Sequence, residues 1–220
     1  MSVLTADTSG DHAGAAVSSN PAAGASYLSN PAVGTMCWWL YRSGTVEDLG
    51  MGGIGNSANN NDFIALGGTC EVRHSGSTQF KYDIGNTPTT ANTWVHVCLR
   101  VNSSGNSLWL DGVQQSPSYT TGSSATQAWI SGLSAYDRIS FGRFPGNVER
   151  STTGSFAEAA IWNTDLADNE IVSLANGLSP LAVRSHALEW YSPLLENTTA
   201  GVNIMARPAG QWSLTGSPSA

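Results

Sequence analysis

The sequence predicts an all-β protein in which two antiparallel sheets pack as a sandwich, with one short helix outside them. Strict alternation of apolar and polar residues marks a hairpin around residues 93–115. Turn-forming residues recur about every ten positions through much of the chain, as they do in sandwiches. Only one segment has the spacing and end signals of a helix. A chain of 220 residues suits one large core of this kind.

The hairpin is the least ambiguous element. Every second residue over 95–101 is aliphatic, which predicts a strand with one face in a core. Residues 102–106 are turn formers that include a glycine, so the chain reverses there and returns through 107–110. Asp111-Gly112 favours a second tight turn into a strand at 113–115. The residues expected to be buried between the two sheets are Val95, Val97, Leu99, Leu108 and Leu110.

The other strands follow from shorter patterns of the same kind. Two partly irregular strands are expected before residue 34, and a weaker one at 211–215. Residues 44–61 and 116–134 are rich in turn formers and are predicted to be loops, the first broken by a short piece at 49–54. Clear strands are expected at 36–41, 63–66, 69–73, 79–84, 138–142 and 187–191.

The single helix is predicted over residues 168–176. Asp168 and Glu170 fall in its first turn, where negative charge is favourable. An apolar stripe follows, and Gly177 is placed for a left-handed cap at the C-terminal end.

Two stretches carry a family resemblance. One is the Trp94-x-His96-Val97 strand with its glycine-containing turn and the Asp111-Gly112 end of the next strand; the other is residues 154–171, GSFAEAAIWNTDLADNEI. Together they resemble the laminin-G and pentraxin group of concanavalin A-like jelly-roll sandwiches. The family's helix-capping serine is Ala167 here, so Asp165 or Asp168 is expected to replace it.

Composition excludes two classes of partner. Charged residues make up 11% of the chain, Lys81 is the only lysine, and the net charge is −7. No basic cluster exists to displace counterions from a phosphate backbone, so we expect no nucleic acid. No apolar run is long enough to span a membrane, and we expect no membrane partner. The first residues lack the positive and apolar regions of a secretory signal, which suggests either a removed signal or another route outward, such as assembly into a virus particle.

The resemblance also bears on the three cysteines. Cys37 and Cys98 stand where pentraxins place the two halves of their disulfide, on neighbouring strands. A disulfide and a pair of buried thiols both remain open for them. Cys70 has no evident partner.

The acidic residues do not form a catalytic pair. A retaining glycosidase of this fold resembles the laminarinases, which carry Glu-x-Asp-x-x-Glu on one strand. Glu47 and Asp48 are adjacent, and Glu158 has no acidic residue two or four positions away. Sialidase-type boxes are also absent from the sequence. We therefore expect no enzyme activity.

Metal ligands are sparse. The four histidines have no ligand spacing, which argues against zinc. Asn60, Asn61 and Asp62 follow Cys37 at about the distance at which pentraxins supply their first calcium ligands, so they are a weak Ca²⁺ candidate. The second pentraxin cluster is replaced by residues 143–146, RFPG. The alternative is an asparagine-rich turn, and we expect no cofactor requirement.

Aromatic residues offer the best candidate contacts. Trp39, Tyr41, Trp94 and Trp109 are expected on one outer face, where they could stack on sugar rings or dock a partner. We expect the helix or the C-terminal segment to cover Trp39 and Trp94, and for Trp109 both cover and exposure remain open. The candidate ligand or partner residues are Trp109, Tyr41 and Trp212.

These observations favour a binding or structural module. We take residues 1–177 as the sandwich core and 178–220 as an extension that returns to it and makes partner contacts. The tail phrases at 177–184, 188–194 and 213–218 look like those of laminin-G-like proteins common in phage and prophage genomes. The main hypothesis is therefore a virion component, a bacteriophage capsid decoration (cement) protein or fibre head, that contacts other virion proteins or itself at the virion surface. The alternative is an extracellular, carbohydrate-binding lectin whose partner is a surface glycan; a glycoside hydrolase comes third.

Overall fold

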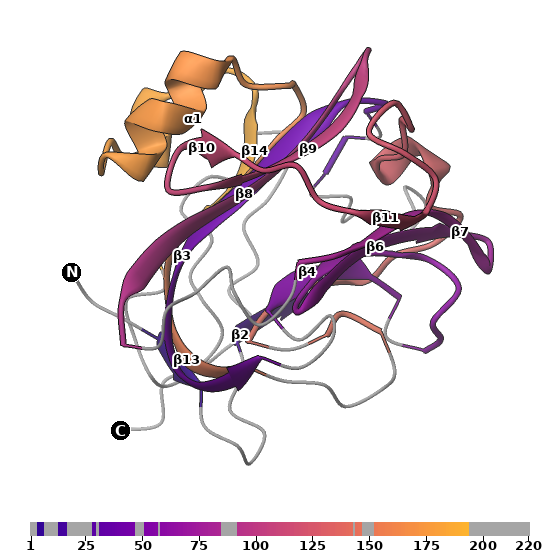
Figure 1. The fold of residues 1–220 in the computed structure, drawn as a ribbon, viewed down its shortest axis with the longest axis horizontal. Coiled ribbons are helices and arrows are strands. Elements are labelled where there is room, and N and C mark those ends of the chain that lie inside the picture. Colours follow the sequence, from indigo (N-terminus) through magenta and orange to yellow (C-terminus); the bar gives the residue numbers. More distant parts are fainter. Residues whose placement is uncertain are drawn as a thin grey trace.

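The computed structural model of the protein describes residues 4–6, 13–16, 28–29, 31–46, 51–56, 58–84, 92–142, 144–146 and 152–193, with the backbone alone for 4–6, 13–16, 42–46 and 152–154. Within these residues the chain forms two antiparallel sheets of seven strands each, packed face to face (Figure 1). The predicted all-β sandwich is confirmed.

The sheet that contains the central hairpin, here called sheet A, has the order β1-β13-β3-β8-β9-β10, and β14 also pairs with β13. Its strands are β1 (Leu4–Ala6), β3 (Gly34–Val46), β8 (Trp94–Asn102), β9 (Gly105–Leu110), β10 (Val113–Gln114), β13 (Thr152–Trp162) and β14 (Leu188–Ser192). Because β14 pairs with β13, part of the segment after residue 177 belongs to the sandwich itself.

The facing sheet, sheet B, has the order β11-β7-β6-β5-β4-β12-β2. Its strands are β2 (Ala13–Ala16), β4 (Gly52–Gly55), β5 (Phe63–Leu66), β6 (Thr69–His74), β7 (Ser77–Asp83), β11 (Tyr119–Thr121) and β12 (Arg138–Phe141). Two short 3₁₀ helices, η2 (Ile130–Gly132) and η3 (Pro180–Ala182), lie in the connections.

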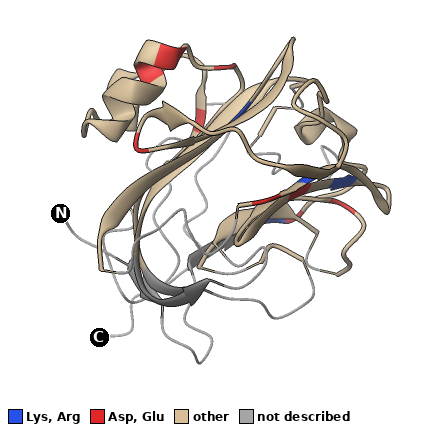
Figure 2. Cartoon of the chain, in the orientation of Figure 1, with Lys and Arg blue, Asp and Glu red and all other residues tan. Residues whose placement is uncertain are grey.

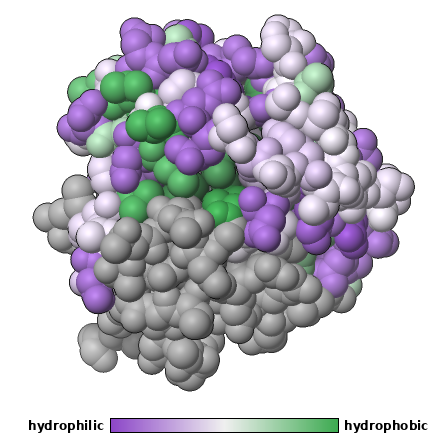
Figure 3. Space-filling view, in the orientation of Figure 1, coloured by the Kyte–Doolittle hydropathy of each residue, from purple (hydrophilic) through white to green (hydrophobic). Residues whose placement is uncertain are grey.

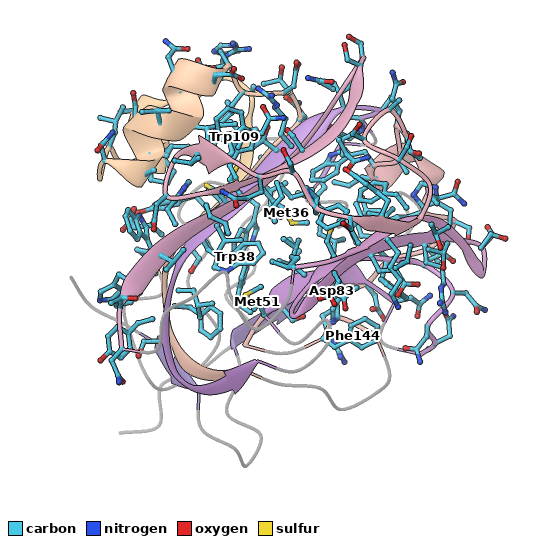
Figure 4. All side chains as sticks on the ribbon, in the orientation of Figure 1. Met36, Trp38, Met51, Asp83, Trp109 and Phe144 are labelled. Atoms are coloured by element: carbon cyan, nitrogen blue, oxygen red, sulfur yellow. The ribbon has the colours of Figure 1, made fainter. Side chains whose placement is uncertain are left out.

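The main core fills the space between the sheets (Figure 4). Trp38 of β3 is fully buried and meets the ring of Phe141 edge-on at 5.2 Å, and Phe141 stacks on Trp190 at 5.4 Å. Each large apolar side chain buried in this way stabilises the fold by roughly 1.5–3 kcal/mol. The aliphatic residues predicted from the hairpin are confirmed in this core, with Leu110 partly buried against it: Val95, Val97, Leu99, Leu108 and Leu110.

The second turn of the hairpin forms as its sequence predicts. Asp111 and Gly112 both have positive φ, 49° and 76°, which is the requirement of the primed turns that match strand twist. The Asp111 carboxylate accepts a 2.8 Å hydrogen bond from the His96 backbone N–H, and the Asp111 N–H donates to the His96 carbonyl at 2.9 Å. The turn is therefore held on both sides of the aspartate.

Two predicted loops contain strands. The glycine-rich β4 lies inside the expected loop 44–61, where three glycines in four residues hide any apolar alternation. A Cβ at Gly53 would collide with the Ile64 carbonyl, so the close approach of β5 requires glycine there. The three-residue β11 lies inside the expected loop 116–134 and is too short to show a period. β3 is also longer than the predicted 36–41.

The predicted helix is confirmed as α1 (Asp168–Ala175), but its first turn is capped differently from our expectation. Ala167 is the N-cap, and the Glu170 carboxylate accepts a 2.7 Å hydrogen bond from its N–H, which is half of a capping box. Asp168 does not cap the helix; its carboxylate pairs with Arg100 of β8 at 2.6 Å. Gly177 has φ of 89°, as a left-handed C-terminal cap requires.

Candidate functional site

Helix α1 lies on the side of sheet A that faces away from sheet B (Figure 1). Because the strands are antiparallel and in register, side chains on this outer face line up in rows across the sheet. Ile171 and Leu174 of α1 pack onto one such row. We call that row the covered end of the outer face; it consists of Tyr191, Ala160, Cys37, Cys98 and Trp109.

Polar contacts hold α1 over the covered end. The Arg100 guanidinium donates to the Leu166 carbonyl at 3.0 Å and pairs with Asp168 at 2.6 Å. The Thr35 hydroxyl accepts from the Leu166 N–H at 3.0 Å. Arg184, beyond the helix, pairs with Glu170 at 2.7 Å. Figure 2 shows acidic residues in the first turn of α1. The described parts of the two sheets carry few charged residues.

Trp109 belongs to the covered end and is only 5% exposed (Figure 4). Its indole N–H donates to the Ser107 hydroxyl at 3.0 Å, and the Arg100 guanidinium lies 5.2 Å from its ring centroid. The structure thus decides the open question of its cover, and this burial argues against Trp109 as a ligand or partner residue. The residue is core, because α1 is anchored directly above its row.

The opposite end of the outer face is aromatic and partly open. Trp39 lies across from His96 and Tyr41 lies across from Trp94 on β3 and β8. The Tyr41 and Trp94 rings are 5.6 Å apart, and the Trp39 and His96 rings are 5.4 Å apart. Trp39, Tyr41 and Trp94 are each partly exposed, and we call these three the aromatic face.

The exposure of these residues contradicts one prediction and is compatible with another. We expected cover over Trp39 and Trp94, yet both are more exposed than Trp109. Tyr41, a predicted contact residue, lies where a ligand could reach it. Trp212, the third predicted contact residue, and the strand expected at 211–215 lie outside the described residues.

His96 forms the floor beside Trp39. It is 1% exposed, and its Nδ1 has no hydrogen-bond partner. Burial lowers the pKa of His96 to about 4, so the imidazole is neutral at neutral pH. The aromatic face therefore rests on an uncharged, well-packed residue.

A carboxylate on β13 lies on the outer face between the row of Trp39 and the row of Cys37. The register of β13 against β3 shifts between Ala157, which lies opposite Trp39, and Ala160, which lies opposite Cys37. Glu158 falls in this β-bulge and has φ of 51°, a left-handed value that is uncommon for a residue with a side chain. Its carboxylate raises the pKa of Cys37, after the larger effects of burial and of Cys98, which places the charge on the outer face near Cys37.

Tyr191 of β14 orients that carboxylate. The Tyr191 hydroxyl donates a 2.8 Å hydrogen bond to Oε2 of Glu158. Burial, and then this hydrogen bond to a negative group, raises the pKa of Tyr191. Glu158 itself is partly exposed and lies in the stretch 154–171 that carries the family resemblance. The available signal was the broken alternation of β13, in which the inward-facing Phe156 and Ala159 are three residues apart instead of two.

Cys37 and Cys98 lie in the positions that the sequence predicted. Cys37 lies directly opposite Cys98 across β3 and β8, which confirms that they are adjacent. All three cysteines are buried free thiols in the structure. Burial raises the pKa of each, that of Cys70 to about 12, so none is an activated nucleophile.

In the calcium candidate, the oxygens of Asp62 and the Asn60 carbonyl accept hydrogen bonds from the protein. The Asp62 carboxylate accepts hydrogen bonds from the Ser75 N–H at 3.0 Å, the Ser134 N–H at 2.9 Å and the Ser134 hydroxyl at 2.6 Å. Burial alone would raise the pKa of Asp62, but these donors outweigh it and hold the pKa below its ordinary range. The Asn60 carbonyl accepts from the Arg73 guanidinium at 3.3 Å, and the Asn61 N–H donates to Asn59. The loop is an asparagine-rich turn fastened by Asp62.

Sheet B carries one closed charge network. Glu71 is 3% exposed and pairs with Arg73 at 2.8 Å and Lys81 at 3.2 Å, and it accepts from the Thr78 hydroxyl at 2.9 Å. Each donor already has this acceptor, so the network offers little to a ligand. No group of three or more potential metal ligands occurs among the described residues, and none of the helices described there is long and apolar enough to cross a membrane.

The fold and the open aromatic face together define a lectin-like jelly-roll sandwich. The family model of the concanavalin A-like lectin/glucanases superfamily (Laminin_G_3) matches residues 10–172. The chain therefore belongs to this superfamily, as the sequence resemblance indicated. No curated protein sequence matches it.

Solved structures agree on the fold. The carbohydrate-binding module CBM40 of a Ruminococcus gnavus sialidase, bound to α2,3-sialyllactose, has a TM-score of 0.52 at 14% identity over 80% of this chain and 97% of its own. A proposed carbohydrate-binding protein from Bacteroides ovatus has a TM-score of 0.55 at 15% identity over 94% and 57%. The leech intramolecular trans-sialidase has a TM-score of 0.52 at 16% identity over 81% and 28%. At these identities the likeness shows a shared fold alone.

Proposed function

We propose that the protein is a non-catalytic carbohydrate-binding module that holds a sugar ring against the aromatic face. The observation that carries the proposal is the partly exposed Trp39, Tyr41 and Trp94 on one face of sheet A, with Glu158 between the row of Trp39 and the row of Cys37 on the same face. Sugar rings present apolar C–H faces and polar edges, so they need an aromatic surface with a hydrogen-bond acceptor next to it.

The aromatic face suits the apolar side of a sugar. Its members are cross-strand neighbours on β3 and β8, which are central strands of sheet A. Side chains on central strands lose little freedom when a ligand binds, because the backbone beneath them is already ordered. An aromatic group left partly in water on such a strand gains free energy when a ligand covers it.

Glu158 suits the polar edge. Tyr191 engages one carboxylate oxygen, and the other has no hydrogen-bond partner among the described residues. A carboxylate oxygen held in place can accept hydrogen bonds from neighbouring hydroxyls of a sugar. The strained φ of Glu158 fits a binding role, since such backbone outliers cluster at ligand sites.

The same geometry argues against hydrolysis. Retaining glycosidases place two carboxyl groups about 5 Å apart and inverting enzymes place them farther apart, on either side of the bond. On β13 the residues two and four positions from Glu158 are not acidic. The residues nearest to it across β3 and β14 are Trp39, Tyr191 and Ser192, which are not acidic either. One carboxylate can bind a sugar, but the neighbouring strand residues described here supply no second carboxylate for this chemistry.

Relatives of the same fold support glycan binding. The Ruminococcus gnavus module is solved with sialyllactose, and the Bacteroides ovatus protein is described by carbohydrate binding. The virion role that we expected as the main hypothesis has no support among these relatives, so glycan binding replaces it. We place the module at an extracellular or particle surface, where glycans are displayed.

A glycan array followed by titration calorimetry tests this function. We expect at least one oligosaccharide to bind, and Trp39→Ala and Trp94→Ala each to weaken that binding by about tenfold or more. Val113→Ala is the matched control, because Val113 is 62% exposed on the same sheet but lies outside the aromatic face. Equal losses in all three variants, or binding to no glycan, would contradict the proposal.

A further inference from the structure

We propose that the aromatic face selects its glycan by charge: it prefers sugars that carry a free amine, accepts neutral sugars and excludes sugars that carry a carboxylate. This inference rests on the function proposed above and concerns the same site. It separates this protein from the sialyllactose-bound module that shares its fold, since sialic acid is anionic.

Among the described side chains, the ionised groups near the aromatic face are both negative: Glu158 on β13, and Asp111, whose carboxylate accepts from the N–H of His96. Glu158 makes one hydrogen bond, with the neutral Tyr191 hydroxyl, and no ion pair with the described basic residues. His96 lies under the face as a neutral imidazole. A ligand on this face would therefore lie near a carboxylate that forms no ion pair with the described basic residues.

The described cations that form ion pairs are engaged elsewhere. Arg100 is bound to Asp168 under α1, and Arg184 is bound to Glu170. Arg73 and Lys81 are bound to Glu71 on sheet B. None of these four ion pairs places its cation at the aromatic face, and Arg73 and Lys81 belong to the other sheet.

Both kinds of group at the site attract a cation. A protonated amine on the sugar would form a charge-assisted hydrogen bond with Glu158, which is stronger than one from a neutral hydroxyl. Aromatic ring faces attract ammonium groups within about 6 Å and disfavour anions. Because Glu158 is partly buried, salt screens its charge less than that of a fully exposed side chain. The aromatic and acidic components therefore favour the same ligand charge.

The exposed apolar side chains do not offer a comparable site. Figure 3 shows apolar surface around α1 and β10. The large apolar residues exposed there and in the following turn are Val113, Val172, Leu178 and Leu181. They lack both aromatic rings and a directed polar group, so ligand selection by charge belongs to the aromatic face.

The test is an array of hexose oligosaccharides, each printed in a free-amine, a neutral and a carboxylated form, with lactose against 3′-sialyllactose as one pair. Binding is measured at a pH at which the amine is protonated and at two salt concentrations. We expect the amine form to bind about tenfold tighter than the neutral form, and the carboxylated form to bind weakest. The preference should shrink in high salt, because attraction to a partly exposed charge is screened.

Glu158→Gln is the decisive variant, because it keeps the shape of the side chain and removes the charge. Its preference for amine over neutral sugars should fall severalfold, with the Asp111 carboxylate beside His96 supplying what remains, whereas Val113→Ala should keep the full preference. Tighter binding of 3′-sialyllactose than of lactose, or an amine preference that is undiminished in Glu158→Gln, would overturn the inference while the sugar-binding function stands. Binding of none of the sugars by the wild-type protein would overturn both. The salt dependence of the wild-type protein tests the inference even if the variant does not fold.

Discussion

The two ends of the outer face of sheet A share strands β3 and β8 but differ in how far their side chains are exposed. At the covered end, Cys37, Cys98 and Trp109 lie under α1 and are at most 5% exposed. The next row along β3 and β8 contains the partly exposed Trp39 and the buried His96. The row after that contains Tyr41 and Trp94, which are both partly exposed. The position at which one short helix is anchored thus divides this face into a buried end and a partly open end.

The anchor explains the position of the boundary. Arg100 lies two residues beyond Cys98 on β8 and holds the start of α1 through Leu166 and Asp168. The eight residues of α1 span only about 12 Å, at 1.5 Å per residue. The helix therefore protects the rows next to Arg100 and stops short of Tyr41 and Trp94. The position of Arg100, which holds the start of α1, therefore sets which rows of the outer face are buried.

The largest expected contrast comes from truncating one tryptophan at each end. Trp109→Ala should lower the free energy of unfolding by about 3–5 kcal/mol, because it leaves a cavity beneath α1 and removes the ring contact with Arg100. Trp39→Ala should cost about 1 kcal/mol, since its ring is partly in water already. Urea denaturation of both variants measures the difference. Similar losses at both sites would break the comparison.

A pH titration sharpens the role of His96 at the boundary. The unfolded imidazole takes up a proton near its ordinary pKa of 6.5, whereas the folded one does so only near 4. The unfolded state thus binds more protons between these values, so the free energy of unfolding should fall as the pH drops from about 6.5 to about 4. The loss from His96 is on the order of 3 kcal/mol.

His96→Gln is the comparison for that titration. His74 also has a pKa lowered mainly by burial and contributes in the same pH range, so a weaker slope should remain in the variant. Denaturant midpoints at several pH values measure both slopes. An unchanged slope in His96→Gln would show that His96 is not the buried neutral base described above.

A smaller effect is expected from loosening the anchor. Arg100→Met keeps the length of the side chain but removes the bonds to Leu166, Asp168 and Ser107, and should cost about 2 kcal/mol. Asp168→Asn should cost less than about 1 kcal/mol, because the Asp168 side chain is 68% exposed. Hydrogen exchange of the α1 amides should accelerate in Arg100→Met. Loss of sugar binding in that variant would contradict the separation of the two ends.

The sequence predicted the sandwich because its strands alternate clearly where one face is buried. The aliphatic residues over 95–101 and the Asp111-Gly112 turn could be read directly, and both are as expected. β4 was anticipated only as a short piece at 49–54, because its three glycines hide the period, and the three-residue β11 was missed because it is too short to show one. The local sequence pattern therefore predicted only the strands in which apolar and polar residues alternate clearly.

The candidate site was harder to predict because exposure on an outer face depends on distant contacts. Nothing near Trp109 indicates that Arg100 will hold α1 above it through Asp168, 68 residues later in the chain. Alternation therefore placed Trp39, Trp94 and Trp109 on one face correctly but could not tell which ones the helix covers. Glu158 was noticed as a lone acid, yet only the bulge shows that it joins the aromatic face.

The indole N–H signals in a two-dimensional NMR spectrum test the division of the outer face most directly. Single Trp→Phe variants would assign the signals of Trp39, Trp94, Trp109 and Trp162, and a binding oligosaccharide from the array would then be titrated. We expect the signals of Trp39 and Trp94 to shift, while those of Trp109 and Trp162, whose N–H groups are bonded to Ser107 and Val183 beneath the covered end, stay in place. Shifts confined to Trp109 and Trp162, with Trp39 and Trp94 unmoved, would contradict the account.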